Sequence, residues 1–177
     1  MQYISYYQSP IGNILLAADN IGLTGLWFEG QKYFALYLDK EREEKEIPLF
    51  EKAKHWLDIY FSGREPDFSL PLHFTGTDFQ NKVWKILCSI PYGQTTTYGA
   101  IARQIAAERG LQRMSAQAVG GAVGHNEISI VVPCHRVVGT NGSLTGYAGG
   151  IDRKVKLLNL ERADMQSFFI PKRGTAL

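Results

Sequence analysis

The sequence predicts an α+β protein in which a small antiparallel sheet with one helix precedes a helical region containing a helix-turn-helix. Three observations predict this class: β-rich runs separated by turn residues near the N-terminus, helical periodicity in the second half, and a change of charge between the halves. Residues 1–75 contain 7 Lys and Arg against 11 Asp and Glu, whereas residues 76–177 contain 12 against 6. The formal net charge of +2 therefore combines an acidic front half with a basic back half.

The change of charge also marks the expected domain boundary. Residues 65–74 contain two prolines and alternating Leu and Phe, a pattern typical of an extended linker. We therefore divide the chain into a front domain, residues 1–75, and a back domain, residues 76–177. With 45% hydrophobic residues and a mean hydropathy of −0.16, the composition excludes a disordered tail and a membrane protein.

Three strands and one helix are expected in the front domain. Residues 3–7, 13–18 and 23–28 form β-rich runs, and turn-forming residues at 9–12 and 19–22 separate them. After a charged stretch, apolar residues recur at three-and-four spacing and predict an amphipathic helix that stops at Ser62-Gly63. These apolar residues are Phe50, Ala53, Trp56, Leu57 and Tyr60.

Three helices open the back domain. The first is capped at Thr77-Asp78 and stops at the turn formed by residues 90–93. The second covers residues 98–106 behind a run of threonines, and the third covers residues 115–124 after a polar turn. Two short helices joined by a turn outline a helix-turn-helix.

Small residues dominate the third helix, which contains three glycines. Each glycine costs a helix about 1 kcal/mol relative to alanine, so their presence requires a reason. Either another helix or a narrow nucleic-acid groove approaches this backbone closely. The basic charge of this half favours a polyanion partner, and a solvated charged face is the alternative explanation.

Cysteine usage indicates the cellular compartment. Only Cys88 and Cys134 occur, too few for a disulfide framework. The N-terminus lacks a basic segment followed by an apolar one, and no apolar run approaches the roughly 18 residues of a membrane span. We therefore expect a cytoplasmic protein, where a cysteine is either a small buried hydrophobe or a reactive thiol. Cys88, beside Ile86 and Leu87 on the first helix, is expected in the core.

The segment with the clearest chemistry begins at the apolar run 128–132, which is expected to be a buried, strand-like stretch leading into Pro133-Cys134-His135. A free thiol with a pKa near 8.5 is only about 3% thiolate at pH 7, so a nucleophilic cysteine needs a nearby base or cation. Consecutive extended residues point to opposite faces, so direct contact with His135 and a relay through a water are both open. An inert buried cysteine is the alternative. A metal site is disfavoured because no second Cys or His stands at ligand spacing.

Three runs carry a resemblance to a known family: Pro-Cys-His-Arg-Val-Val at 133–138, Gly-Tyr-Ala-Gly-Gly at 146–150 and Leu-Leu-Asn-Leu-Glu at 157–161. With them the chain resembles the O6-alkylguanine-DNA alkyltransferases, also called methylated-DNA–protein-cysteine methyltransferases. The resemblance extends back through Ile-Pro-Tyr-Gly at 90–93 and, more loosely, over the front domain. It implies a ribonuclease H-like front domain and a winged-helix-like back domain.

The resemblance implies direct-reversal DNA repair. One alkyl or methyl group would move irreversibly from O6-alkylguanine to a cysteine of the protein, so each molecule reacts once, without cofactor or metal. O4-alkylthymine is a second candidate lesion. The target base must be flipped out of the duplex, because O6 is covered inside it. The implied partner is double-stranded DNA bound through its minor groove, with no membrane contact, and the protein is expected to act as a monomer.

The resemblance also assigns roles around the cysteine. Cys134 would be the nucleophile and alkyl acceptor, and His135 the base that deprotonates it through a bridging water. Glu161 would orient the imidazole and compensate its charge, and Asn126 would brace the turn that carries Cys134. This arrangement follows the logic of an activated nucleophile.

Further roles fall on the groups that would hold the flipped base. Tyr98 would donate to N3 of guanine and crowd the target phosphate. The backbone carbonyls of Cys134 and Val137 would accept the exocyclic amine, and the Ala148 N–H would reach O6. Tyr147 would form a wall of the pocket.

Two departures from the family pattern lie near the third helix. Gln117 stands where the family usually inserts an arginine into the space left by the flipped base, so we expect weaker DNA binding, with Arg113 as a partial substitute. Glu127 stands where a proline commonly follows Asn126, so this loop is expected to be looser or turned away from DNA.

Phosphate contacts are expected from the back domain alone, around Arg103, Arg109, Arg113 and Arg136, although Arg136 could instead be bound near the active site. The front domain shows no chemistry of its own and is expected to have a supporting role. Two other functions remain in competition: a non-catalytic binder of alkylated DNA, whose relatives lack the cysteine, and a helix-turn-helix transcription regulator with an inert cysteine. Alkylation of Cys134 separates all three.

Overall fold

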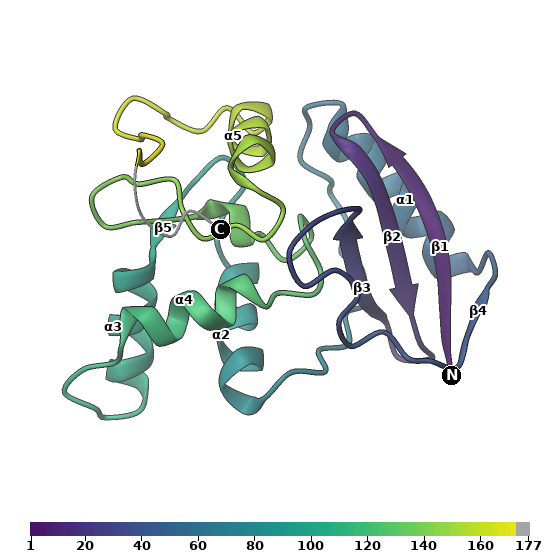
Figure 1. The fold of residues 1–177 in the computed structure, drawn as a ribbon, viewed down its shortest axis with the longest axis horizontal. Coiled ribbons are helices and arrows are strands. Elements are labelled where there is room, and N and C mark those ends of the chain that lie inside the picture. Colours follow the sequence, from purple (N-terminus) through teal and green to yellow (C-terminus); the bar gives the residue numbers. More distant parts are fainter. Residues whose placement is uncertain (173–177) are drawn as a thin grey trace.

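A mixed sheet and a group of short helices lie side by side in the computed structural model, which describes residues 1–172 (Figure 1). The front part contains β1 (Gln2–Ser9), β2 (Gly12–Ala18), β3 (Leu23–Phe28), β4 (Arg42–Glu44) and α1 (Pro48–Phe61). The back part contains α2 (Asp78–Cys88), β5 (Thr96–Thr97), α3 (Tyr98–Glu108), α4 (Ala116–Gly124), the 3-10 turn η1 (Cys134–Arg136), β6 (Val137–Val138) and α5 (Ile151–Leu160).

The sheet has the strand order β3-β2-β1-β4. Strands β1, β2 and β3 pair antiparallel, as the sequence predicted, whereas β4 adds a parallel edge strand to β1. The sequence did not predict β4, because its three residues are Arg, Glu and Glu and have no β-rich pattern. An exposed, charged and very short strand is a form that natural sheets commonly use at an edge.

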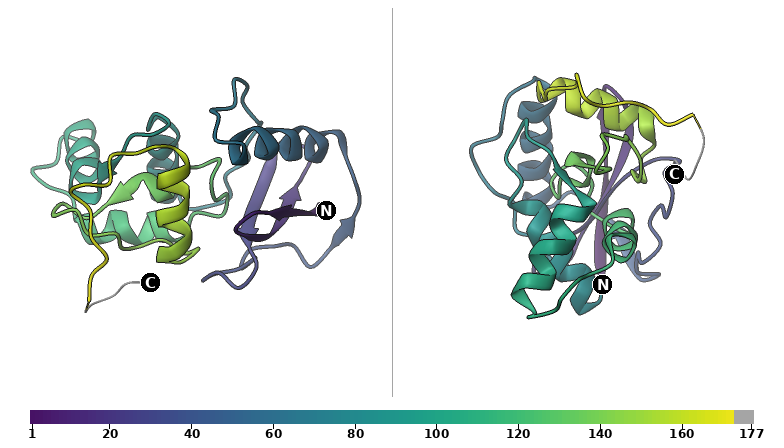
Figure 2. Two further views of the ribbon diagram at one scale, coloured as in Figure 1. Left: turned by 90° about the horizontal axis from the view of Figure 1, so that it is seen from above. Right: turned by 90° about the vertical axis from the view of Figure 1, so that its left-hand side faces the viewer.

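Alternation along the strands gives the sheet two apolar faces. Ile14 and Leu16 face the core that contains α1, whereas Leu15 and Trp27 belong to a separate cluster on the other face. Helix α1 lies along one face, as Figure 2 shows from above. Its predicted apolar residues Phe50, Ala53, Leu57 and Tyr60 are buried.

The helices of the back part begin at the predicted caps. Thr77 forms a capping box with Gln80 at the start of α2, and the Thr97 and Ser115 side chains accept backbone N–H groups at the starts of α3 and α4. Helix α4 packs against both α2 and α3. The helix-turn-helix therefore forms where the sequence predicted it.

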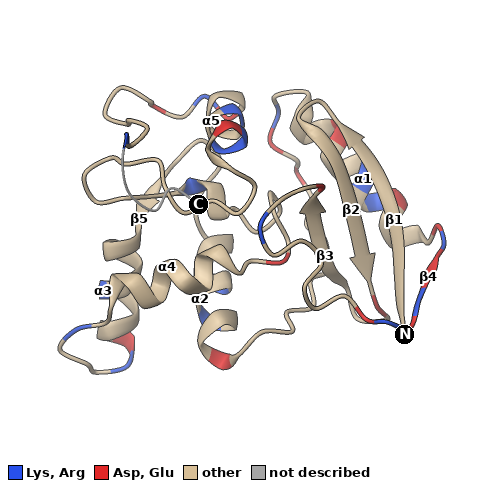
Figure 3. Cartoon of the chain, viewed as in Figure 1, with Lys and Arg blue, Asp and Glu red and all other residues tan. Residues whose placement is uncertain are grey.

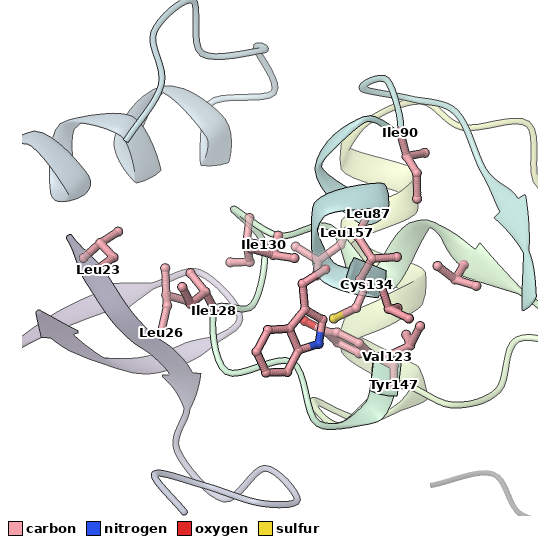
Figure 4. Packing of buried hydrophobic residues seen from close by; sticks show 14 of the residues in the cluster. Leu23, Leu26, Leu87, Ile90, Val123, Ile128, Ile130, Cys134, Tyr147 and Leu157 are labelled. Carbon is pink, nitrogen blue, oxygen red and sulfur yellow. The ribbon is translucent and has the colours of Figure 1, made fainter. Parts of the chain in front are cut away.

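One apolar core runs through both parts of the molecule. Leu23 and Leu26 of β3 belong to the same cluster as Ile128 and Ile130, which precede Cys134 (Figure 4). The expected strand at 128–132 is wrong: Ile128 makes an isolated bridge to Leu26, and the chain then turns, with φ of 68° at Ile130. These residues are apolar because they fill the junction between the two parts, and an apolar run alone does not distinguish a strand from a buried turn.

A second junction joins α5 to the front part. Arg153 Nε donates to the Ile11 carbonyl at 2.9 Å, and its guanidinium lies 4.7 Å from the centre of the Phe28 ring. The same side chain donates to the Gly149 carbonyl at 3.2 Å. Arg153 therefore fixes the loop before α5 against the sheet.

The C-terminal segment packs on the body as far as the structure describes it. Leu144 N–H donates to the Phe169 carbonyl at 2.9 Å, and Phe169 N–H donates to the Gly142 carbonyl at 3.1 Å. Within residues 1–172, no helix has both the length and the apolar character needed to cross a membrane.

Candidate active site

The turn η1 carries Cys134 and His135 at the centre of the back part. Cys134 is only 3% exposed and lies among Leu87, Val123 and Leu157, as Figure 4 shows. Burial raises the pKa of the Cys134 thiol, and a hydrogen bond from Asn126 and the charge of Lys154 act in the opposite direction. The thiol is therefore fixed in position and requires a partner to lose its proton.

Asn126 connects the end of α4 to the turn that carries the cysteine. Its Nδ2 donates to the Val132 carbonyl at 2.8 Å and to Cys134 Sγ at 3.1 Å, and its Oδ1 accepts the Ile128 N–H at 3.0 Å. The side chain is buried. One amide group thus holds both ends of the apolar turn and touches the sulfur.

The Glu161 carboxylate, at the C-terminal cap of α5, accepts hydrogen bonds from four residues in three different parts of the chain. His135 Nε2 lies 2.7 Å from Oε1, and Arg136 donates to both oxygens at 2.9 Å. The Gly93 N–H and the Tyr60 hydroxyl complete the set, at 3.2 and 2.7 Å. Burial alone would raise the pKa of Glu161, but the hydrogen bonds and charges of His135 and Arg136 outweigh it and hold that pKa well below the ordinary range.

This arrangement determines which nitrogen of His135 can act as a base. With Nε2 directed at a carboxylate, the ring proton is assigned to Nε2, so Nδ1 carries the lone pair. Nδ1 is buried and has no hydrogen-bond partner among residues 1–172. Burial lowers the pKa of His135, and the hydrogen bond to Glu161 offsets only part of that effect.

Lys154 is a site residue that the sequence analysis missed. It is fully buried, and its Nζ donates to the carbonyls of Val137 and Thr145 at 2.5 and 2.7 Å. Burial lowers its pKa to about 8, while the nearby Cys134 acts to raise it. The available signal was its spacing, because residues 154, 157 and 158 share the buried face of α5.

The loop before α5 meets the start of α3. The Tyr98 hydroxyl donates to the Thr145 carbonyl at 2.9 Å. Gly146 has a φ of 81°, and a Cβ there would collide with the Tyr98 hydroxyl. The glycine of the Gly-Tyr motif is therefore required by both its backbone conformation and this close approach.

Three backbone groups are expected to bind the flipped nucleobase: the Cys134 and Val137 carbonyls and the Ala148 N–H. The Cys134 carbonyl accepts the Val137 N–H, and the Val137 carbonyl accepts Lys154, so each has a second lone pair. The Ala148 carbonyl accepts the Lys32 N–H at 3.0 Å, and its own N–H makes no backbone hydrogen bond within the described chain. Tyr147 is 1% exposed, and its ring lies edge-on to the His135 ring at 6.4 Å between centres.

A surface hollow of about 530 Å³ brings Gln117 together with Tyr98 and Gly146. His125 also lines it and stacks on Tyr33 of the front part, with ring centres 4.1 Å apart. The remaining lining residues come from α4 and the loop before α5. They are Ala116, Gly120, Gly121, Gly124, Thr140 and Thr145.

The expected arginine substitute lies elsewhere. Arg113 does not line the hollow that contains Gln117, but a neighbouring one between α3 and the turn that precedes α4, together with Arg103. Figure 3 shows that α4 carries no Lys, Arg, Asp or Glu. The basic residues nearest to it in the chain, Arg109 and Arg113, lie in the turn that precedes it. Arg136, with its bonds to Glu161, is buried and belongs to the active site rather than to a phosphate-binding surface.

The glycines of α4 differ in what surrounds them. A Cβ at Gly120 would make an ordinary contact with the Tyr98 ring, whereas a Cβ at Gly121 would have nothing within 4 Å. Gly121 is exposed. Packing inside the described protein therefore does not account for Gly121, and of the two reasons considered for the small residues, the approach of an external partner remains for this position.

Cys88, His55 and His73 lie outside the group of residues around Glu161. The prediction that Cys88 lies in the core is wrong: it is the last residue of α2 and its side chain is exposed. His55 stacks on Phe68, and His73 Nδ1 lies 2.6 Å from an Asp19 oxygen, so both are structural. Within residues 1–172, no group of three or more His, Cys, Asp or Glu side chains is arranged to hold a metal ion.

Glu127 is turned away from the exposed face of α4. It is 7% exposed, its Oε2 accepts the Thr75 hydroxyl at 2.9 Å, and its backbone carbonyl accepts the Leu26 N–H at 2.8 Å. Burial raises the pKa of this carboxyl, and the bond from Thr75 opposes the shift. The second departure from the family pattern is therefore a buried junction residue.

We expect Glu127→Gln to stabilise the protein at neutral pH by about 1 kcal/mol, because Gln keeps an oxygen for Thr75 and removes a buried charge. A raised pKa in the folded state favours folding at low pH, and that contribution is lost as the pH rises through the folded value. The variant should therefore melt roughly 2–4 °C higher at pH 7.5 and at the same temperature as the wild type near pH 4. Thermal denaturation at both pH values checks this, and a lower melting temperature at pH 7.5 would contradict it.

Comparison with known proteins covers both halves of the chain. Residues 78–163 match the family model described as 6-O-methylguanine DNA methyltransferase, DNA binding domain, and residues 2–74 match its ribonuclease-like domain. A methylated-DNA–protein-cysteine methyltransferase of Methanosarcina barkeri is 45% identical over 165 residues, 93% of this chain and 99% of that protein. The protein of the same name from Mycobacterium tuberculosis is 46% identical over 155 residues, 88% of this chain and 89% of that protein.

Solved structures give the same correspondence. Mycobacterium tuberculosis OGT in complex with DNA aligns with a TM-score of 0.79 at 44% identity, covering 90% of this chain and 92% of that one. An O6-methylguanine DNA methyltransferase from Methanococcus jannaschii aligns with a TM-score of 0.62 at 29% identity, and the alignment covers 96% of this chain and 100% of that one.

Proposed function

We propose that Cys134 is the alkyl acceptor of this protein. The chain belongs to the methylated-DNA–protein-cysteine methyltransferase family, which repairs DNA by direct transfer of an alkyl group to a cysteine. The observation that carries the assignment is the buried Cys134 thiol on the same turn as a His135–Glu161 pair. Cys88, the other cysteine, is exposed and has no comparable pair beside it in the described chain.

In the proposed reaction, His135 takes the thiol proton through a bridging water at Nδ1. Glu161 holds the imidazole in this tautomer and stabilises the imidazolium that forms. Asn126 holds the sulfur and the turn that carries it. The thiolate then attacks the alkyl carbon, the S–C bond forms, and the bond from that carbon to O6 breaks.

The leaving guanine takes the electron pair of the broken bond, and the thiol proton is returned to it, so that neutral guanine remains. We assign to Tyr98 the donation to N3, for which its hydroxyl hydrogen turns from the Thr145 carbonyl to the base, and to the Ala148 N–H the contact with O6. The Cys134 and Val137 carbonyls accept the exocyclic amine with their second lone pairs. Tyr147 forms a wall of this pocket. O6-alkylguanine is the proposed lesion, and the thioether product makes each molecule react once.

DNA is the partner of this chain, and we propose that α4 docks in its minor groove. The small exposed residues of α4 support this, because they let a narrow groove approach the backbone. Gln117 would occupy the space left by the flipped base, and arginines of the α3–α4 turn would contact phosphates. We further propose that the protein acts as a monomer in the cytoplasm, where thiols stay reduced.

Intact mass spectrometry after incubation with O6-benzylguanine tests the proposed function. Wild-type protein should gain one benzyl group, peptide mapping should place it on Cys134, and Cys134→Ser should gain none. Cys88→Ser is the matched control and should react like the wild type. An unmodified wild type, or a Cys134→Ser variant that still gains the group, would remove the assignment.

Gly121→Leu tests the docking of α4. The variant should fold at least as well as the wild type, since the added side chain meets open space and glycine disfavours the helix by about 1 kcal/mol. Its affinity for a duplex containing O6-methylguanine should fall at least tenfold, while its reaction with free O6-benzylguanine stays unchanged. Fluorescence anisotropy measures the affinity, and unchanged DNA binding would contradict minor-groove docking by this face.

Gln117→Arg tests the first departure from the family pattern. Arginine adds a charge and a longer stem within the same hollow, so the affinity for duplex DNA should rise about tenfold at low salt, and the gain should shrink as salt increases. Gln104→Arg, an exposed site on α3, is the control for added charge alone. Equal or weaker binding by Gln117→Arg at every salt concentration would refute this expectation.

A further inference from the structure

The front part of the molecule supplies one side chain to the active site. Tyr60, near the end of α1, is fully buried, and its hydroxyl donates to Glu161 Oε1 at 2.7 Å. The same hydroxyl lies 3.4 Å from His135 Nε2. The sequence pattern indicates no chemistry in the front domain, because Tyr60 follows the apolar spacing of α1 and is explained by packing alone.

We propose that Tyr60 is a positioning residue for the His135–Glu161 pair, so that activation of the Cys134 thiol depends on a hydroxyl from the front domain. This inference rests on the proposed function and extends it to a residue 101 positions before Glu161 in the chain. The hydroxyl, His135 Nε2 and Arg136 Nη2 all lie within hydrogen-bond distance of the same carboxylate oxygen.

The surroundings of Tyr60 keep its hydroxyl in the role of donor. Burial raises the pKa of Tyr60 well above the ordinary value, and the charge of Glu161 raises it further. Trp56 stacks on the ring at 5.5 Å, and Tyr92 lies edge-on to it at 6.1 Å. The ring is therefore held by aromatic neighbours, with its hydroxyl directed at the Glu161 carboxylate.

The hydroxyl has two physical effects on the pair. It restricts the rotation of Glu161, which in turn keeps the His135 proton on Nε2 and the lone pair on Nδ1. It also withdraws electron density from Oε1, so the carboxylate attracts the imidazolium less strongly. Without the hydroxyl, Glu161 becomes a better acceptor, and the pKa of His135 rises.

Other titratable and charged groups face the His135–Glu161 pair, and their effect on the pKa of His135 is the same in the wild type and in Tyr60→Phe. They are Arg136 and Cys134 on η1, Lys154 on α5, Tyr147 on the preceding loop and Tyr92 on the turn after α2. Tyr60→Phe changes none of them, because the phenyl ring retains the aromatic contacts with Trp56 and Tyr92.

The test measures alkyl transfer from free O6-benzylguanine to Tyr60→Phe as a function of pH. We expect the rate at pH 7 to fall about tenfold, which is the usual size of the loss when a hydrogen-bond partner that orients a functional histidine or carboxylate is removed. Since His135 acts as a base only when neutral, a higher pKa also moves the acidic limb of the profile to higher pH. Affinity for duplex DNA should stay unchanged.

Tyr7→Phe is the matched control, because Tyr7 also donates to a carboxylate on α1, Asp58, at 2.7 Å, but outside the active site. Its profile should superimpose on that of the wild type. Tyr60→Phe added to Glu161→Gln should cause no further loss, since the hydroxyl acts through the carboxylate. A wild-type rate in Tyr60→Phe, a uniform loss with an unmoved profile, or a full tenfold loss on top of Glu161→Gln would each overturn the proposal.

NMR titration of the His135 ring in unreacted protein separates this proposal from the proposed function. If the wild type takes up no benzyl group, the proposed function fails, whereas an upward shift of the His135 titration in Tyr60→Phe still supports the positioning role. An identical titration in wild type and variant would overturn that role whatever the alkyl-transfer result.

Discussion

Glu161→Gln should lower the melting temperature of this protein and slow alkyl transfer to Cys134. Donors from His135, Arg136, Gly93 and Tyr60 converge on the two carboxylate oxygens. Glutamine provides one oxygen, and its amide directs hydrogens at donors. Breaking a buried ion pair typically costs about 3–5 kcal/mol, so the melting temperature should fall by roughly 10 °C.

The rate of alkyl transfer should fall about 100-fold or more in Glu161→Gln at a temperature where the variant is folded, because the imidazole loses both its fixed tautomer and its counter-charge. DNA affinity should change much less, since the carboxylate is buried away from the surface of α4. Parallel losses in alkyl transfer and in DNA binding would contradict the relay.

The pH dependence of stability provides an independent check on Glu161. Its pKa is depressed in the folded protein, so its contribution is complete above the ordinary value of 4.5 and is lost as the pH falls below it. The difference in melting temperature between wild type and Glu161→Gln should therefore narrow below about pH 4.5. Glu46→Gln, which removes an exposed ion pair with Lys54 at 2.6 Å, should cost less than about 1 kcal/mol at any pH.

Lys154→Met should slow alkyl transfer by about 10-fold to 100-fold. The ammonium of Lys154 favours the thiolate form of Cys134, and its removal should shift the pH profile of the reaction toward higher pH. The substitution also leaves the Val137 carbonyl without its charged donor, which loosens the turn that carries the cysteine.

Lys156→Met is the control for Lys154→Met, since Lys156 lies on the same helix with its side chain exposed. It should react at the wild-type rate. Stopped-flow measurement of benzyl transfer from pH 6 to pH 10 compares the two variants. An unshifted profile in Lys154→Met would show that its charge does not act on the thiol.

Local sequence signals predicted the helices and strands of this fold well where one short pattern, a helix cap or an alternation of apolar residues, determines the backbone structure. The caps at Thr77, Thr97 and Ser115 begin helices, and the alternation in the first three runs gives the antiparallel strands. The run 128–132 failed because the same apolar composition suits a strand and a buried turn. Strand β4 had no apolar pattern to detect.

Only those residues of the candidate site that lie within a recognisable sequence motif could be predicted. Cys134, His135 and Glu161 were named from runs of adjacent residues, and in the structure His135 Nε2 lies 2.7 Å from Glu161 Oε1. Their roles in alkyl transfer stay a prediction. Lys154 and Tyr60 escaped because each stands at an apolar position of a helix, where the sequence cannot distinguish a packed side chain from one that reaches a carboxylate or a carbonyl. Their roles depend on which helix ends meet, a property of the tertiary structure.

The order in which the active-site residues leave the ribosome follows from their places on α1, η1 and α5. Tyr60 emerges first, Cys134 and His135 follow, and Glu161 comes last, so a nascent chain that ends before Glu161 lacks the complete pair. Until α5 docks, the sulfur has the reactivity of an ordinary thiol, only a few per cent ionised at neutral pH. If Cys134 is the alkyl acceptor proposed above, its reactivity toward alkyl groups should therefore appear only after α5 has docked and brought Glu161 to His135.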